Sequence, residues 1–220
     1  MSDAIRFPLV LFLITAICGA VLAGLFQVTR GPIAEAQKAK KEKSLKEIFG
    51  DEVELGDPLT ASLDLGGDKP VEVEYYKVEL DGMTYYATIG TSDKCYTSSV
   101  PIQIMVGASF SQDGEPVIKR IAVVKSAETP GLGEEIKAEK KSFYLTDIFK
   151  DKKETDEDED KRVWLSQFND ETMDQIALKR SGGKIDAVAG ATITSHAVVL
   201  AVRQAVERLK LIREQEASAE

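Results

Sequence analysis

The residues best suited to chemistry form one short run near the C-terminus, from Asp186 to Ser195, which reads Asp-Ala-Val-Ala-Gly-Ala-Thr-Ile-Thr-Ser. Gly190 and Ala191 are small enough to let a backbone approach a ligand closely, and Thr194 or Ser195 is suited to cap a following helix. The first amides of a helix lack internal partners and lie at the positive end of its dipole, so they favour an anionic phosphate. The run therefore predicts a phosphate site, although an ordinary helix start with a Ser/Thr cap explains the same residues.

A second run of turn-forming residues lies far from the first in the sequence and reads Glu128-Thr129-Pro130-Gly131-Leu132-Gly133. Pro130 fixes its own φ angle, and the two glycines allow a tight backbone. This composition predicts a turn after a strand, and by itself it is explained by a plain structural turn.

The pattern Asp-x-x-x-Gly-Ala-Thr, from Asp186 to Thr192, resembles the flavinylation motif of the FMN-binding domain family. That family includes the G subunit of the Rnf ion-translocating electron transport complex and the C subunit of the sodium-pumping NADH:quinone oxidoreductase. The resemblance implies that a separate flavin transferase recognises Asp186 and esterifies the hydroxyl of Thr192 to the phosphate of FMN. Ala189 departs from the pattern, because the family more often has Ser or Thr there.

The run Glu128 to Gly133 closely resembles the Glu-Thr-Pro-Gly-Leu-Gly loop of the same family. The backbone of such a turn is able to offer amide groups to the isoalloxazine. The resemblance extends over nearly the whole chain, and the chain length and motif spacing favour the Rnf G subunit over the longer quinone-reductase C subunit. The segment Cys95 to Ser99 lacks the glycines common in the family, so we assign it no cofactor contact. The FMN-binding residues implied are Thr192 (covalent), Gly190, Ala191, Thr194, Ser195, Glu128, Thr129, Gly131, Leu132 and Gly133.

An apolar segment of 20 residues, Phe7 to Phe26, contains no charged residue and is bracketed by Arg6 and Arg30. A helix of this length spans about 30 Å, the thickness of a bilayer core. A cleaved signal peptide would have a shorter apolar run and a more basic start, and a lipoprotein signal at Cys18 is disfavoured by the bulky Ile17. We therefore expect an uncleaved, single-pass anchor in the lipid bilayer.

The charges after this segment bear on its orientation. Five lysines between Lys38 and Lys46 follow the apolar run, and the positive-inside rule would keep them in the cytoplasm. That rule weakens for large translocated domains, and three glutamates are interleaved with the lysines. The family resemblance implies the opposite orientation, in an inner membrane with the FMN domain on the extracytoplasmic, periplasmic side, and we adopt it.

Alternation of apolar and polar residues predicts two β-hairpins. The first runs from Val71 to Ile89 around Asp81-Gly82, and the second from Pro101 to Val124 around Asp113-Gly114. Asp-Gly between β-type runs favours a tight turn, because the turn needs positive φ angles. The hairpins predict an antiparallel sheet of at least four strands.

Helical and loop segments surround these hairpins. We expect a very polar, solvated stalk helix at Ile33–Phe49 that ends at Gly50, with Ile33, Leu45, Ile48 and Phe49 as its few apolar anchors. A loop is expected at Gly56–Pro70. Further predicted elements are a helical stretch at 134–149, a charged loop at 151–161, packing of Trp164 and Phe168 against the core, a short strand at 184–188, and a long amphipathic helix after Ser195. Strands followed by helices indicate an α+β fold.

Composition excludes several classes of function. A net charge of −9 argues against nucleic-acid binding, which needs a basic surface. One histidine and two separated cysteines give no metal site, and no nucleophile–base pair indicates a catalytic residue. We expect a 1–30 anchor, a 31–70 juxtamembrane helix and linker, a 71–213 FMN-binding domain and a 214–220 tail.

The resemblance implies a redox subunit that works with the other membrane and peripheral subunits of an Rnf-type complex. Such a complex moves electrons between ferredoxin and NAD and couples this transfer to ion translocation. The alternative is an anchored extracytoplasmic module that binds FMN or another phosphate ligand as a sensor or regulator, without electron transfer.

Overall fold

The protein is described by a computed structural model that covers residues 3–51, 53, 56–66, 70–96, 100–128, 136, 164–188 and 190–219. Two compact units divide the chain, residues 1–41 and residues 42–220. The predicted helix at 134–149, apart from Ile136, and the charged loop at 151–161 lie outside the described residues, as does Ala189.

The first unit consists of most of helix α1 (Asp3–Phe49), which contains Pro8 and Pro32. This helix is long and apolar enough to cross a membrane, and its large apolar side chains from Phe7 to Val28 are exposed. The hydroxyl of Thr15 donates to the carbonyls of Leu11 and Phe12, both at 3.0 Å. Such internal bonding satisfies a polar group in lipid, where water is absent. The predicted span and the predicted stalk are therefore parts of one continuous helix.

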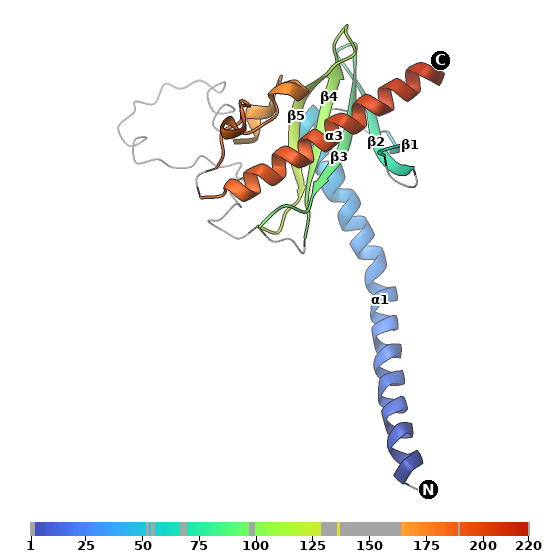
Figure 1. Ribbon diagram of the computed structural model, residues 1–220. Helices are drawn as coiled ribbons and strands as arrows, with labels where there is room; N and C mark the ends of the chain where they lie inside the picture. Colours follow the sequence, from blue (N-terminus) through green and yellow to red (C-terminus); the bar gives the residue numbers. More distant parts are fainter. Residues whose placement is uncertain are drawn as a thin grey trace, which may run out of the picture. The chain divides into compact units, whose positions relative to one another are not determined.

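The second unit is built on a five-stranded antiparallel sheet in the order β1-β2-β3-β4-β5, with α3 in front of it in Figure 1. The strands are β1 (Leu59–Leu63), β2 (Val71–Leu80), β3 (Met83–Ser92), β4 (Ile102–Phe110) and β5 (Pro116–Lys125). The predicted hairpins correspond to β2–β3 and β4–β5, so the α+β prediction is confirmed. The predicted loop at Gly56–Pro70 is wrong in part, because β1 lies within it and pairs with the first half of β2.

Both Asp-Gly pairs lie in turns, as predicted, but only Asp81-Gly82 forms a tight turn with positive φ angles at both residues. Asp81 (φ 53°) and Gly82 (φ 75°) both adopt positive φ angles between β2 and β3, which is the requirement of a two-residue type I′ turn. Between β4 and β5, Gly114 has φ 79°, and its amide donates to the carbonyl of Ser111 at 3.0 Å. These turns join each pair of strands with short connections.

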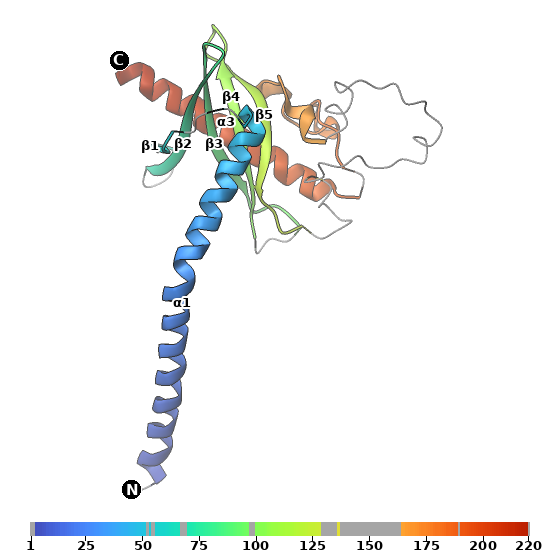
Figure 2. The same cartoon turned by 180° about the vertical axis from the view of Figure 1, so that it is seen from behind.

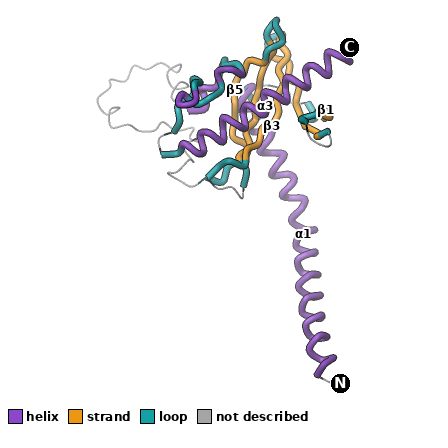
Figure 3. Tube along the Cα trace, viewed as in Figure 1, coloured by secondary structure: helices purple, strands orange, loops and turns teal. Residues whose placement is uncertain are grey.

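Helix α3 (Thr192–Ala219) crosses one face of the sheet, as Figures 1 and 3 show. The apolar residues at helical spacing are buried as predicted; they are Val198, Val202, Ala205, Leu209 and Ile212. The helix approaches β3 so closely that a Cβ added at Gly90 would lie 1.8 Å from the carbonyl oxygen of Ala201. Phe168 is fully buried and Trp164 packs against the same core, so their predicted packing is confirmed.

The last turns of α1 pack on the opposite face of the sheet, which is the nearer one in Figure 2. Leu45, Ile48 and Phe49 are buried there, and a Cβ at Gly107 would lie 2.5 Å from Ile48. These three residues are among the apolar anchors expected in the polar stalk helix. The expectation of a solvated stalk is wrong for these last turns only, because the anchors cover the sheet there. The helix ends where predicted: Gly50 has φ 100°, and its amide donates to the carbonyl of Lys46 at 2.7 Å.

In the described part of the connection from residue 164 onward, three short 3-10 helices lead to α3: η3 (Trp164–Phe168), η4 (Met173–Gln175) and η5 (Lys179–Ser181). They are visible beside the start of α3 in Figure 3. The predicted strand at 184–188 is wrong, because within this segment only Ile185 forms a β-bridge, to Leu178.

Candidate functional site

The predicted attachment residue, Thr192, is the first residue of helix α3. The amide of Ser195 donates to the carbonyl of Ala191 at 2.9 Å. The amides of Thr192, Ile193 and Thr194 precede this bond, and first-turn amides have no partner within the helix. The helix dipole is positive at the same place. This end of α3 therefore has the donors and the charge that an anionic phosphate requires.

Neither Thr194 nor Ser195 caps this helix, so that prediction is wrong. Both residues lie inside the first turn, and the hydroxyl of Ser195 instead binds back to the preceding segment. It accepts a bond from the amide of Val188 at 2.9 Å and donates to the carbonyl of Ala191 at 2.9 Å. The hydroxyl thus fixes the turn that precedes Thr192.

Gly190 gives that turn its shape. Its φ angle of 76° lies in the left-handed region, which side chains other than glycine rarely adopt. The amide of Ala191 closes the turn by donating to the carbonyl of Val188 at 3.0 Å. Thr192 is half-buried immediately after the turn, while Ile193 is 55% exposed. Thr192, the predicted attachment residue, is therefore partly exposed on a constrained backbone.

The two runs singled out in the sequence meet at Glu128 and Thr194. The hydroxyl of Thr194 donates to Oε2 of Glu128 at 3.0 Å, and both side chains are buried. The other carboxylate oxygen, Oε1, is buried without a partner among the described residues. A buried oxygen of this kind calls for a donor. The remaining predicted contacts of this run, Thr129, Gly131, Leu132 and Gly133, lie outside the described residues.

Asp186 is held by three side chains that sequence reasoning did not find. Its amide donates to Oε1 of Gln167 at 2.8 Å, and its carbonyl accepts a bond from Nε1 of Trp164 at 2.6 Å. Its carboxylate forms an ion pair with Lys179 at 2.6 Å, and both of these side chains are about 60% exposed. The sequence carried no signal for these contacts, because each depends on where a short helix, η3 or η5, packs against the segment that contains Asp186.

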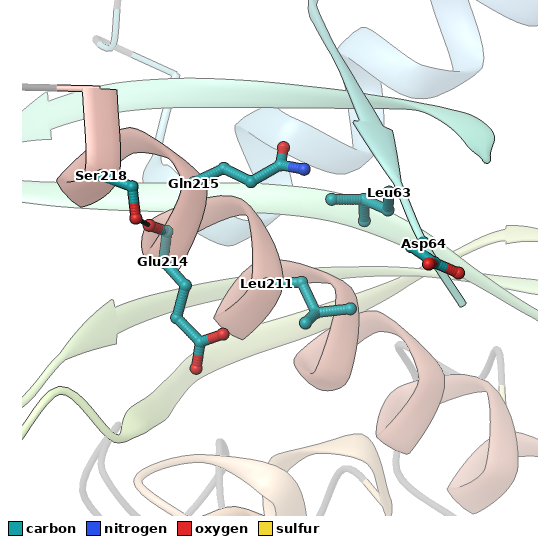
Figure 4. Close-up of a pocket in the computed structure, with 6 residues that line it drawn as sticks. All are labelled: Leu63, Asp64, Leu211, Glu214, Gln215 and Ser218. Atoms are coloured by element: carbon teal, nitrogen blue, oxygen red, sulfur yellow. Dashed lines mark hydrogen bonds between the residues drawn. The ribbon is translucent and has the colours of Figure 1, made fainter. Parts of the chain in front are cut away.

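A groove elsewhere in the fold lies between the end of β1 and the last turns of α3 (Figure 4). It is lined by Leu63, Asp64, Leu211, Glu214, Gln215 and Ser218. Leu211 is 19 residues after Thr192 on one helix, which corresponds to about 28 Å at 1.5 Å per residue. The groove is therefore separate from the attachment segment.

The residues around Thr192 fit FMN by the chemistry of their groups. The free amides at the start of α3 suit the phosphate, and the hydroxyl of Thr192 is a possible ester oxygen. The unpartnered oxygen of Glu128 requires a donor, and FMN carries donors in its ribityl hydroxyls and its ring N–H. The phosphate of FMN is thus complemented by the amides at the start of α3, and its hydrogen-bond donors are complemented by the carboxylate of Glu128.

Comparison with known proteins agrees with this chemistry. Residues 98–207, which are half of the chain, match the FMN-binding domain family. The chain belongs to that family. The matched FMN-binding domain contains Glu128 and the whole run from Asp186 to Ser195, together with strands β4 and β5 and most of α3.

Relatives align over most of the length of this FMN-binding protein. The G subunit of the Na(+)-translocating ferredoxin:NAD(+) oxidoreductase complex of Acetobacterium woodii is 30% identical over 92% of this chain and 89% of its own. The G subunit of the ion-translocating oxidoreductase complex of Methanosarcina acetivorans is 26% identical over 88% of both chains. The protein of the same name from Haemophilus influenzae is 25% identical over 88% of this chain and 84% of its own.

Proposed function

We propose that this chain is the flavin-carrying, electron-transferring subunit of an ion-translocating ferredoxin:NAD oxidoreductase complex. The observation that carries the proposal is the buried bond between Glu128 and Thr194, which joins the two runs of the FMN-binding domain beside Thr192. The names of the relatives from Acetobacterium woodii and Methanosarcina acetivorans support the assignment to such a complex.

In this proposal FMN is esterified to Thr192 by a flavin transferase, and Asp186 is the residue that the transferase recognises. FMN supplies one- and two-electron redox chemistry when bound, and the protein supplies position and electrostatics. The amides at the start of α3 hold the phosphate, and Gly190 and Ser195 shape the turn before it. Glu128 accepts a hydrogen bond from a donor group of the flavin, and Thr194 fixes the carboxylate.

We further propose that α1 is a single-pass anchor and that the FMN-binding domain lies outside the cytoplasm. We propose residues 71–213 as the core of this domain, to which β1 and the end of α3 are joined by strand pairing and by the bonds of Glu216. The apolar helix and its exposed side chains support the anchor. A covalent link suits an external domain, from which a dissociated cofactor would be lost. A cysteine introduced at the exposed Gly56 tests the side: a membrane-impermeant maleimide should label it in intact cells, and labelling only after lysis would reverse the orientation.

The attachment is tested by producing the full chain together with a flavin transferase and separating it on a denaturing gel. Wild-type chain should carry flavin fluorescence and the mass of one FMN ester. Thr192→Val should lose both, while Thr192→Ser, which keeps a hydroxyl, should retain them. Fluorescence that persists in Thr192→Val would overturn Thr192 as the acceptor.

The second candidate, a sensor or regulator that binds FMN without electron transfer, is favoured only by the solvent-exposed position of the attachment turn. Redox titration in the native membrane separates the two functions. An electron-transferring subunit should be reduced by ferredoxin and should be isolated with other membrane subunits. A flavin that stays oxidised in a chain isolated by itself would support the sensor.

A further inference from the structure

The segment between Ile185 and Thr192 leads to the attachment residue without regular secondary structure among its described residues. Its position depends on bonds from other elements. At its C-terminal end, Ser195 binds the amide of Val188 and so ties the segment to helix α3. At its N-terminal end, the corresponding tie is made at Asp186 by two side chains of η3.

Both backbone groups of Asp186 are bound by η3. Gln167 accepts the hydrogen of the Asp186 amide at 2.8 Å, and the indole of Trp164 donates to the Asp186 carbonyl at 2.6 Å. The two bonds span 19 and 22 residues of chain. Together they replace the ladder bonds that a neighbouring strand would supply, so they fix the backbone of this residue in both directions.

Helix η3 is itself anchored in the core. Phe168 is fully buried and Leu165 is 8% exposed, and both belong to the cluster that contains Val198 and Val202 of α3. The ring of Trp164 packs edge-on against Phe168 with 5.6 Å between ring centroids. A chain of packed side chains therefore connects the domain core to the backbone of Asp186.

The side chain of Asp186 is free of this restraint. Its carboxylate is 61% exposed and contacts only the equally exposed Lys179 among its described ion pairs. An exposed pair of this kind contributes little to stability. A fixed backbone with an exposed carboxylate is suited to recognition by a second protein, because little conformational entropy is lost on binding.

We propose that Gln167 and Trp164 are positioning residues for FMN attachment, which hold the segment from Asp186 to Thr192 in the conformation that the flavin transferase binds. The inference rests on the proposed function. In the reaction, the Thr192 oxygen bonds to the phosphorus of an FMN phosphoanhydride, such as a flavin dinucleotide. The anhydride P–O bond breaks, the nucleoside monophosphate leaves, the hydroxyl proton passes to solvent, and no electrons are exchanged.

The test measures the initial rate of covalent FMN incorporation into the purified full chain in detergent, with transferase and flavin dinucleotide, over a range of chain concentrations. Gln167→Leu removes the acceptor, and Trp164→Phe removes the donor while keeping an aromatic ring. If only a fraction of chains presents the segment correctly, the KM rises by the inverse of that fraction and kcat is unchanged. We expect each variant to raise the KM about tenfold or more, equivalent to about 1.4 kcal/mol.

Gln204→Leu is the matched control. Gln204 accepts the amide hydrogen of Thr91 at 2.8 Å, so it makes the same kind of bond as Gln167 at the same distance, on β3. The melting temperature of the Gln204→Leu variant should fall as much as that of Gln167→Leu, and its KM should equal the wild-type value. A general loss of structure would raise the KM of both variants.

If both Gln167→Leu and Trp164→Phe keep the wild-type KM, the inference is overturned and the proposed function stays intact. The same conclusion follows if the KM of Gln204→Leu rises as much as theirs. Failure of the wild-type chain to form an FMN ester, while a known FMN-binding domain is modified by the same transferase, would overturn both. Retention of the ester in wild type and its slower formation in the two variants would support both.

Discussion

Glu128 and Thr194 are 66 residues apart in the sequence and form a buried hydrogen bond of 3.0 Å. Glu128 follows the last strand of the sheet, and Thr194 lies in the first turn of α3. The bond therefore holds the start of the helix, with its free amides, against the loop that begins after β5. Among the described residues, this bond joins the two runs of the FMN-binding domain.

Thr194→Val should destabilise the FMN-free chain by about 2 kcal/mol, because it leaves a second buried carboxylate oxygen without a partner. Urea unfolding followed by tryptophan fluorescence measures the change. Thr194→Ser keeps the hydroxyl and should unfold within about 0.5 kcal/mol of wild type. Equal stability of the valine and serine variants would contradict the role of this bond.

Gly190→Ala should slow covalent FMN incorporation. Gly190 has a φ of 76°, and an alanine in this left-handed conformation costs about 1–2 kcal/mol, so fewer chains would hold the turn in its present shape. Gly66 has the same φ of 76° and equally open surroundings, so Gly66→Ala is the control. Both variants should lose similar stability, and only Gly190→Ala should be modified slowly by the transferase. The same rate for both would show that the turn does not present Thr192.

Gly90→Ala should destabilise the fold by about 3 kcal/mol, because overpacking at a well-packed contact forces the backbone to shift. The added Cβ would lie 1.8 Å from the carbonyl oxygen of Ala201, so α3 would have to move away from β3. Gly56→Ala, at an exposed position with open space, should be nearly neutral. Thermal unfolding monitored by circular dichroism compares the two, and similar melting temperatures would contradict this close contact.

A cluster at the C-terminal end of α3 should make stability depend on pH. Glu216 accepts hydrogen bonds from Tyr75 at 2.9 Å and Tyr86 at 2.7 Å. Burial raises the pKa of Glu216, but the hydrogen bonds from Tyr86 and Tyr75, together with the nearby ammonium of Lys77, outweigh this effect and leave it below its ordinary value. Burial, together with the bond to Glu216, raises the pKa of Tyr75 to about 12.

The signs of these shifts give two pH windows. A carboxyl with a lowered folded pKa adds stability above its unfolded pKa of about 4.3, and this stability is lost as the pH falls from there through the lower folded pKa. A tyrosine with a raised pKa adds stability below its unfolded pKa of about 10, and this stability is lost as the pH rises toward the folded value.

Glu216→Gln should flatten both limbs of the curve of urea midpoint against pH and should bring the pKa of Tyr75 closer to its ordinary value. Tyrosinate absorbance measures that pKa. Glu214→Gln, on the same helix and lining the groove of Figure 4, is the control and should keep both limbs. An unchanged curve in Glu216→Gln would show that the cluster does not couple stability to pH.

The sequence allowed prediction of the features that depend on local chemistry. Asp81-Gly82 requires positive φ angles and therefore marked the first hairpin, and helical spacing from Val198 to Ile212 marked the buried face of α3. Strand β1 was missed because Leu59–Leu63 is short and lies in a segment rich in Gly, Asp and Pro. Its β structure comes from pairing with β2, which local sequence does not encode.

In the candidate site, too, some residues could be predicted from local sequence and others could not. Thr192 and Glu128 were found because each lies in a compact motif, and the structure brings their two runs together. Gln167 and Trp164 were missed because their contacts to Asp186 depend on where η3 packs. The roles assigned to Ser195 and Thr194 as caps were wrong, because their hydroxyls bond to the preceding turn and to Glu128.

The length of α3 has a practical consequence for recombinant work. The helix continues to Ala219, and Glu216 accepts bonds from two strands while Gln215 donates to the carbonyl of Ser62 at 2.8 Å. A truncation after residue 213 would delete these ties and expose the hydroxyls of Tyr75 and Tyr86. Affinity tags and fluorescent fusions therefore belong after the final residue, separated from it by a flexible spacer.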